Sequence, residues 1–334
     1  MDIPTIGLVL IIIALLGIAS IVASLLHRQS LGVDPIVLSR FGSRLRGWWL
    51  LLSLVAFAAL AGKGVVVFLF GAMSFWAMRE FITLTPTRPA DHRPLFLVFF
   101  ICIPLQFVLV WLNLYEIYSI LIPTYVFLLI PIFMAAFGDT KRYLERVAQI
   151  SAALLICVYC LSYAPALLTL DLEPYRVSGA SLLCFFLLMT QLSEVFQYLS
   201  VHFIPMQHSV ASNINTTRTW EGLIASCLGS MLVGTLLHWA TPFSLWGAGI
   251  MSLVIAFMSF GGALTLSAIK RDRGVRDYGT LVVGHGGILD RIDTICFAAP
   301  IFFHITRMYL LCFPAPQATD SAAQISLLFR MLGW

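Results

Sequence analysis

The residues best suited to chemistry lie in one polar segment, residues 267–293, of an otherwise apolar chain. The segment carries five cations and four carboxylates, namely Lys270, Arg271, Arg273, Arg276, Arg291, Asp272, Asp277, Asp290 and Asp293. Between the two charge groups lies a turn made of Gly284, His285, Gly286 and Gly287. Cations bind phosphate oxygens, carboxylates bind a divalent metal ion, and glycines let the backbone approach an anion. The segment therefore predicts a site for a phosphate ester and its metal ion.

Two shorter polar clusters precede this segment. Residues 190–198 close one apolar stretch and include Glu194, Gln197 and Tyr198. Residues 213–222 open the next apolar stretch and include Asn215, Arg218, Thr219 and Glu221. An ionisable residue at membrane depth is costly and is a functional candidate by default, so Glu194 is the leading candidate of these clusters.

The elements that must position these three clusters are transmembrane helices. The chain is 60% apolar and 11% charged, with a mean hydropathy of +0.94, which excludes an ordinary soluble domain. About ten helices are expected, at residues 5–26, 48–62, 64–78, 94–115, 117–138, 147–170, 177–199 and 292–312, with two more passes within 222–269. The sequence thus predicts an all-α polytopic membrane protein. Residues 1–170 form its amino-terminal helices, and residues 171–334 form a carboxy-terminal transmembrane domain that carries the polar clusters.

The basic residues predict the orientation of the helices. With the expected helices alternating in direction, fifteen of the 20 Lys and Arg residues fall on one side of the membrane and three on the other. Positive loops stay in the cytosol, so the catalytic polar face is expected on the cytosolic side and both termini outside. A bacterial inner membrane is the expected location, and the cytosolic cations are expected to attract anionic lipid headgroups.

The ordered spacing of these motifs resembles the phosphatidate cytidylyltransferases, also called CDP-diacylglycerol synthases. The strongest matches are Ser267-x-x-Lys270-Arg271, Arg276-Asp277-x-Gly279 and Gly284-His285-Gly286-Gly287-x-x-Asp290-Arg291-x-Asp293. The elements Arg218-Thr219-Trp220-Glu221-Gly222 and Glu194-x-x-Gln197-Tyr198 resemble two further motifs of that family. The resemblance spans most of the chain and is specific in its carboxy-terminal half.

The resemblance implies a reaction and a role for each motif residue. Members of that family condense CTP with phosphatidate, which gives CDP-diacylglycerol and pyrophosphate. Both reactants are anions, so catalysis rests on positioning and charge neutralisation. Phosphate clamps are implied at Lys270, Arg271, Arg276 and Arg291, a phosphate-bonding imidazole at His285, and Mg²⁺ ligands at Glu194, Asp277, Asp290 and Asp293. Substrate contacts are implied for Ser267, Gly284, Gly286, Gly287, Asn215, Arg218, Thr219, Glu221, Gln197 and Tyr198. A homodimer is also implied, and no nucleic-acid partner is expected.

The chain departs from the family pattern at several motif positions. Ala263 and Glu194 both stand where the family has aspartate. Asn215 stands where the family has serine, and Arg218 where it has lysine. Since alanine cannot bind a cation through its side chain, the metal site is either rearranged or lost. Two functions therefore stay open: a phosphatidate cytidylyltransferase, or a catalytically inactive relative that binds anionic lipids. A transporter fits least, because the polar groups gather at one face rather than at mid-membrane.

Simpler structural roles are also open for single residues. Asp290 and Asp293 could cap the last helix, since acidic residues favour helix amino termini. Lys270 and Arg271 could be a solvated flank of a membrane helix. The adjacent Arg79-Glu80 reads as a structural pair near the cytosolic boundary.

Overall fold

The computed structural model describes residues 3–29, 62–136, 139–172, 175, 177–204, 208–275, 277–279 and 286–313, most of which are helical. The α-helices are α1 (Ile3–Gln29), α3 (Lys63–Thr83), α4 (His92–Leu97), α5 (Ile103–Trp111), α6 (Tyr115–Ile120), α7 (Phe127–Ala136), α8 (Tyr143–Leu154), α9 (Leu161–Ala166), α10 (Gly179–Phe203), α11 (Trp220–Leu236), α12 (Leu245–Asp272) and α13 (Leu289–Cys312). Short 3₁₀ segments are η1 (Pro89–Asp91), η5 (Leu167–Thr169) and η7 (His238–Ala240). Between α10 and α11 lies an antiparallel hairpin of β1 (Ser209–Ala211) and β2 (Asn215–Thr219).

Three of the long helices contain a π-helical stretch that joins two α-helical parts. These stretches are η2 (Val98–Cys102), η3 (Leu121–Val126) and η4 (Leu155–Cys160). Pro104 follows η2 and Pro123 lies within η3. Proline removes a backbone donor from the helix ladder, and a wider turn lets the helix continue past it. The first two helices thus continue past their prolines, and all three run without a break, over Pro89–Trp111, Tyr115–Ala136 and Tyr143–Thr169.

The length and composition of the helices suit a bilayer. Within the described residues, seven helices are long and apolar enough to cross a membrane, and Ile3–Ile18 and Trp220–Leu236 are shorter apolar helices. Large apolar side chains such as Phe96 and Ile132 are exposed on the outside, as is usual for side chains that face lipid. The predicted all-α polytopic membrane protein is thus confirmed. The helix expected at residues 48–62 lies, apart from Gly62, outside the described residues, and every other expected helix coincides with a described one.

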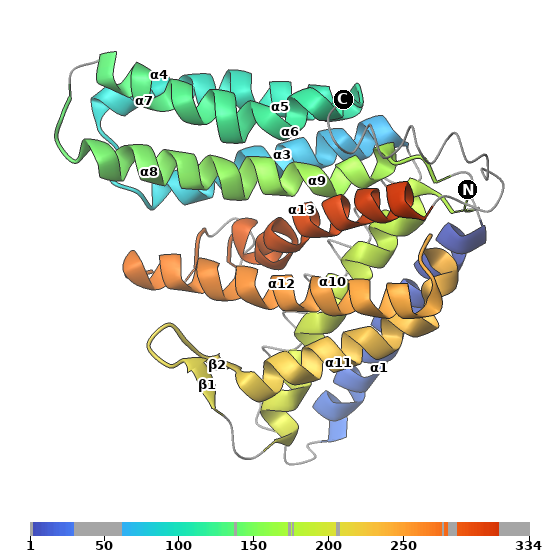
Figure 1. The fold of residues 1–334 in the computed structure, drawn as a ribbon. Coiled ribbons are helices and arrows are strands. Elements are labelled where there is room, and N and C mark those ends of the chain that lie inside the picture. Colours follow the sequence, from blue (N-terminus) through green and yellow to red (C-terminus); the bar gives the residue numbers. More distant parts are fainter. Residues whose placement is uncertain are drawn as a thin grey trace.

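The helices form two groups on either side of α13 (Figure 1). The helices α3 to α9 make one group, drawn in cyan to green, while α1, α10, α11 and α12 make the other. Helix α13 packs against α12 and α10 on one side and against α9, η4 and α3 on the other. Because α13 follows α12 in the sequence and packs on helices of the first 170 residues, the two halves of the chain share one core.

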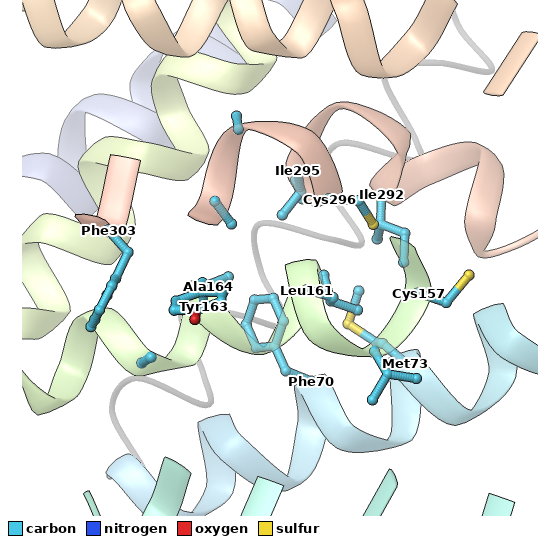
Figure 2. Packing of buried hydrophobic residues seen from close by; sticks show 14 of the residues in the cluster. Phe70, Met73, Cys157, Leu161, Tyr163, Ala164, Ile292, Ile295, Cys296 and Phe303 are labelled. Carbon is cyan, nitrogen blue, oxygen red and sulfur yellow. The ribbon is translucent and has the colours of Figure 1, made fainter. Parts of the chain in front are cut away.

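The centre of this core is the contact between α3, the η4–α9 segment and α13 (Figure 2). The labelled residues are all buried and come from these three elements: Phe70, Met73, Cys157, Leu161, Tyr163, Ala164, Ile292, Ile295, Cys296 and Phe303. Burial in lipid removes little apolar surface from water, so close packing and polar contacts hold membrane helices together. This packing fixes the beginning of α13, where the predicted acidic motif lies, against α3.

Small residues let α12 approach its neighbours closely. A Cβ on Gly234 of α11 would overlap the side chain of Ser252 in α12. A Cβ on Gly262 of α12 would lie 2.6 Å from the backbone oxygen of Asp293 in α13. Such contacts are typical of helix interfaces in membranes. They bring the backbone around Asp293 directly against α12.

Candidate functional site

The three predicted polar clusters meet at one end of the bundle. Residues 190–198 lie in the second half of α10, and residues 213–222 form β2 and the first turn of α11. Residues 267–293 cover the end of α12 and the start of α13. Strand β2 packs against α10, α11 and α12, and Figure 1 shows the hairpin beside this end of α12. The motifs that are far apart in sequence are therefore one site.

An ion pair joins α12 to α13. Nζ of Lys270 donates to Oδ1 of Asp290 at 2.8 Å, and the two side chains are only 18% and 10% exposed. Oδ2 of Asp290 accepts from the backbone N–H groups of Tyr278 (2.9 Å) and Gly287 (3.0 Å). Lys270 is thus not a solvated flank, and Asp290 does more than cap its own helix, because it also binds a backbone amide before the glycine turn.

A second ion pair joins the hairpin to α10. Arg218 donates to Glu194 with both terminal nitrogens, at 2.8 Å to Oε1 and 3.3 Å to Oε2, and it also donates to Oε1 of Gln197. The guanidinium lies 5.9 Å from the ring centre of Phe260 in α12. Burial lowers the pKa of Arg218, but the charge and hydrogen bonds of Glu194 outweigh it, so the pKa lies above its usual value. The two residues that depart from the family pattern here, Glu194 and Arg218, are therefore each other's partner.

Asp293 lies between these two ion pairs. Its carboxylate interacts electrostatically with Glu194, Arg218 and Lys270, and Oδ1 accepts from the backbone N–H of Thr294 at 2.8 Å. Among the described residues it forms no ion pair of its own. The site is thus a row of alternating charges drawn from α10, β2, α12 and α13, with Asp293 as the carboxylate that no described cation binds directly.

The hairpin is fastened over the end of α12 by two hydrogen bonds. Nδ2 of Asn215 donates to Oγ of Ser267 at 3.2 Å, and Nε of Arg271 donates to the backbone oxygen of Ile214 at 3.1 Å.

Thr219 and Glu221 fix the base of the hairpin. Oγ1 of Thr219 accepts from Gly222 N at 3.1 Å and so caps α11, while Glu221 accepts from the backbone and ring of His208. These residues thus position the hairpin that carries Arg218, and their predicted substrate contacts stay predictions.

The glycine turn is crowded by carboxylates. Gly286 has φ of +78°, the left-handed region that favours glycine. A Cβ there would lie 2.9 Å from Oδ2 of Asp290 and 3.5 Å from Oδ1 of the exposed Asp277. The N–H of Gly287 already donates to Asp290. The two described glycines of the turn thus make room for protein carboxylates, and their predicted contact with a substrate phosphate stays a prediction.

Several predicted residues lie outside or at the margin of what the structure describes. Arg276, Gly284 and His285 lie outside the described residues. Tyr198 and Arg291 are described and half-buried, at the same end of α10 and α13 as the rest of the site. Their predicted roles stay predictions.

The carboxylates proposed as metal ligands do not form one compact cage. Among the described residues, no group of three or more His, Cys, Asp or Glu side chains is placed to hold a metal ion. Asp277 and Asp290 lie near Gly286, whereas Glu194 binds Arg218 and interacts with Asp293 only electrostatically. Ala263 is buried, and its methyl group offers no oxygen ligand at the position where the family has aspartate. The donor set of two carboxylates suits Mg²⁺, which commonly takes one or two carboxylates and completes its shell with substrate phosphates and water.

Two residues of the site were not predicted from the sequence. Glu80 of α3 is buried and accepts from the backbone N–H groups of Ile288 and Leu289, both at 2.9 Å. It was interpreted as the structural partner of Arg79, whose charge does act on Glu80 while its guanidinium lies over the ring of Trp76, 5.3 Å from the ring centre. Tyr278 donates its hydroxyl to Leu266 O at 2.8 Å, and burial, reinforced by the charge of Asp290, raises its pKa. The available sequence signal for Glu80 was an ionisable residue within an apolar helix, in a segment that also resembles the family.

Comparison with known proteins identifies the family. The sequence profile of the Cytidylyltransferase family matches residues 42–309. The uncharacterized protein YnbB of Escherichia coli (strain K12) is 33% identical over 268 residues, which cover 79% of this chain and 86% of that protein. The chain therefore belongs to the cytidylyltransferase family, as its motifs indicated.

Relatives with a named activity match over a shorter length. The phosphatidate cytidylyltransferase of Synechocystis sp. is 41% identical over 101 residues, 30% of this chain and 34% of that enzyme. The phosphatidate cytidylyltransferase of Rickettsia bellii is 35% identical over 109 residues, 30% of this chain and 47% of that enzyme. In both cases the chain matches less than half of the enzyme's length.

Proposed function

We propose that this chain transfers a cytidylyl group from CTP to phosphatidate, giving CDP-diacylglycerol and pyrophosphate in phospholipid biosynthesis. The observation that carries the proposal is the row of alternating charges from Glu194 to Asp290. It gathers on α10, β2, α12 and α13 in a chain that belongs to the cytidylyltransferase family. The partial matches to named phosphatidate cytidylyltransferases support the choice of lipid acceptor.

The residues of the site suit a displacement at phosphorus between two anions. A phosphate oxygen of phosphatidate attacks the α-phosphorus of CTP, and the bond from that phosphorus to the bridging oxygen of pyrophosphate breaks. The Lys270 ammonium has three N–H donors. One of them binds Asp290, and the other two can bind phosphate oxygens. Arg218, whose five donors are arranged as a fork, is held in place by Glu194 and Gln197. Both cations are therefore positioned before substrate arrives, which is what charge neutralisation requires.

We further propose that Mg²⁺ is held by Asp293 and Glu194 together with phosphate oxygens of CTP. Both side chains offer oxygen ligands, and Asp293 has no described cation bound to it. When bound, the ion would neutralise charge on the phosphates. Asp277 is exposed beside Gly286 and is a candidate for a further ligand.

The proposed reaction places this end of the bundle in the cytosol. CTP is a cytosolic substrate, and the excess of positive charge on the loops at this end supports that orientation. We accordingly propose an inner-membrane protein with both termini outside.

The test is turnover of α-labelled CTP and phosphatidate by the purified protein in detergent. We expect CDP-diacylglycerol to form with magnesium and not with EDTA. Asp293→Asn should abolish turnover, whereas the matched control Asp272→Asn, at a side chain that is 70% exposed, should keep it. Absence of product from folded wild-type protein would overturn the proposal.

A second candidate function is anionic-lipid binding without catalysis. It is favoured by the buried Ala263 at a family carboxylate position and by the absence of a three-ligand metal cluster among the described residues. This alternative predicts binding of phosphatidate vesicles with no consumption of CTP, so the same protein preparation separates the two functions.

A further inference from the structure

Glu80 connects the amino-terminal helices to the acidic motif through backbone amides. Its side chain leaves the last turns of α3 and is 4% exposed. Oε1 accepts from Ile288 N and Oε2 from Leu289 N, each at 2.9 Å. Helix α13 begins at Leu289 with Ile288 as its N-cap, so both amides lie at the amino terminus of the helix, where N–H groups have no partner within the helix. A carboxylate is the favoured partner there, because the helix dipole is positive at this end.

Two glycines of the motif region leave the space that Glu80 occupies. A Cβ on Gly279 would lie 2.8 Å from Oε1 of Glu80, and a Cβ on Gly287 would overlap Oε2. Neither glycine has a positive φ. Glycine at these two positions is thus required by the approach of Glu80 and not by the backbone conformation.

The next residue of α3 supports the same region. The rings of Phe81 and Tyr278 are stacked, with centres 6.3 Å apart and planes 17° apart. The N–H of Tyr278 in turn donates to Asp290. One turn of α3 therefore contacts both the segment before the glycine turn and the first turn of α13.

We infer that Glu80 is a positioning residue of the active site, which holds the first turn of α13 so that Asp290 binds Lys270 and Asp293 lies within electrostatic reach of Arg218. The inference rests on the proposed function for its catalytic part. Asp290 and Asp293 lie one and four residues after Leu289, so the amides that Glu80 binds fix the height and rotation of both carboxylates. Displacement of a catalytic group by about 1 Å can reduce turnover about 100-fold.

The same contact decides where a substrate phosphate can bind. Free amides at a helix amino terminus form a ready site for a phosphate. Here Glu80 takes the amides of Ile288 and Leu289, and Asp290 takes that of Gly287. The three amides at the start of α13 therefore bind carboxylates, and among the described residues Lys270 and Arg218 are positioned cations that can bind a phosphate.

The first experiment compares Glu80→Gln with the matched control Glu116→Gln, at an exposed glutamate in the first turn of α6. The Gln amide keeps one acceptor oxygen, so one of the two N–H groups loses its partner. We expect kcat to fall about 10- to 100-fold while KM for CTP stays within about threefold. The residues that bind CTP are unchanged in this variant, whereas the positions of the carboxylates on α13 shift. We also expect faster hydrogen exchange in the peptide that contains residues 287–290. Unchanged kcat together with unchanged exchange in Glu80→Gln would overturn the inference.

A double-variant cycle separates this inference from the proposed function. Gly287→Ala should speed exchange at residues 288 and 289 by about tenfold in the wild-type background. In Glu80→Ala, where the clashing carboxylate is gone, the same change should add less than about twofold. Gly261→Ala, whose Cβ would meet no atom within 4 Å, is the control. Independent, additive effects of Glu80 and Gly287 would refute the contact. A wild-type protein that shows this coupling but no turnover would refute the proposed function alone.

Discussion

Nζ of Lys270 and Oδ1 of Asp290 lie 2.8 Å apart, so one charge-assisted hydrogen bond joins the last turn of α12 to the first turn of α13. The Lys270 ammonium also lies 5.4 Å from the ring centre of Tyr278, whose N–H donates to the same Asp290. The motif lysine and the motif aspartate are therefore parts of one unit.

The first prediction concerns this unit. In Asp290→Asn, the side chain has one acceptor oxygen for Lys270, Tyr278 N and Gly287 N, so at least one donor loses its partner. We expect turnover to fall by about 100-fold or more and the free energy of unfolding by about 1–3 kcal/mol. Radiometric turnover and thermal unfolding in the same detergent measure the two effects. Asp272→Asn should change neither, and a fully active Asp290→Asn would contradict the role assigned to this residue.

The sequence predicted the helices and the composition of the site, since both follow from local patterns. Long apolar runs predicted nearly every described helix, and the ordered motifs predicted that Lys270, Asp290 and Asp293 belong to one site. The sequence did not predict that Glu80, about two hundred positions earlier, binds the amides of Ile288 and Leu289. Such a contact depends on how α3 packs on α13, and side-chain spacing along one chain carries no information about that packing.

The roles of single residues were the other part that sequence patterns left undetermined. Glu194 and Arg218 each appeared as a separate departure from the family pattern, and only the fold shows that they form a bidentate pair. Gly286 and Gly287 were assigned to a phosphate because glycine turns often bind one. In the structure, protein carboxylates occupy the space beside them. A glycine in the sequence indicates that another group approaches the backbone closely. Which group that is depends on the tertiary structure.

The second prediction concerns the Glu194–Arg218 pair. Arg218→Lys replaces a fork with a single ammonium, and Glu194→Asp withdraws the carboxylate by one methylene, so each alone breaks the bidentate contact. We expect each single variant to raise KM for CTP and to lose about 1 kcal/mol of stability. The double variant should lose less stability than the sum of the two single losses, with a coupling of about 0.5–3 kcal/mol. Strictly additive effects on thermal unfolding would show that the two changes are independent.

The third prediction concerns the pH dependence of stability that comes from an ion-pair network outside the candidate site. Arg146, 4% exposed, binds Asp139 at 2.9 Å and Asp91 at 3.3 Å. The hydrogen bond from Lys141 N, followed by the charges of Arg146 and Arg88, holds the pKa of Asp139 below its usual 3.8. Because the folded-state pKa is depressed, this stabilisation is present above the unfolded pKa and is lost as pH falls through the folded value. Wild-type protein should therefore lose its advantage in Tm over Asp139→Asn below about pH 4. A constant difference in Tm between pH 3 and pH 7 would contradict this.

The fourth prediction concerns Ala263, the departure that most directly affects metal binding. Its methyl group is buried on α12 next to Gly262, which lies against the backbone of Asp293. Without a metal ion, Ala263→Asp places a third carboxylate near Asp293, so we expect the variant to be less stable by about 2–4 kcal/mol. Millimolar magnesium should reverse that loss, because three carboxylates can share one divalent ion. The measurement is Tm with magnesium and with EDTA. The control is Ala263→Asn, because asparagine has the shape of aspartate without its charge. A magnesium-dependent rise in Tm confined to Ala263→Asp would place position 263 at the metal site. An equal response in both variants would show that position 263 lies outside the metal site, so that Glu194 and Asp293 remain the proposed ligands of the ion.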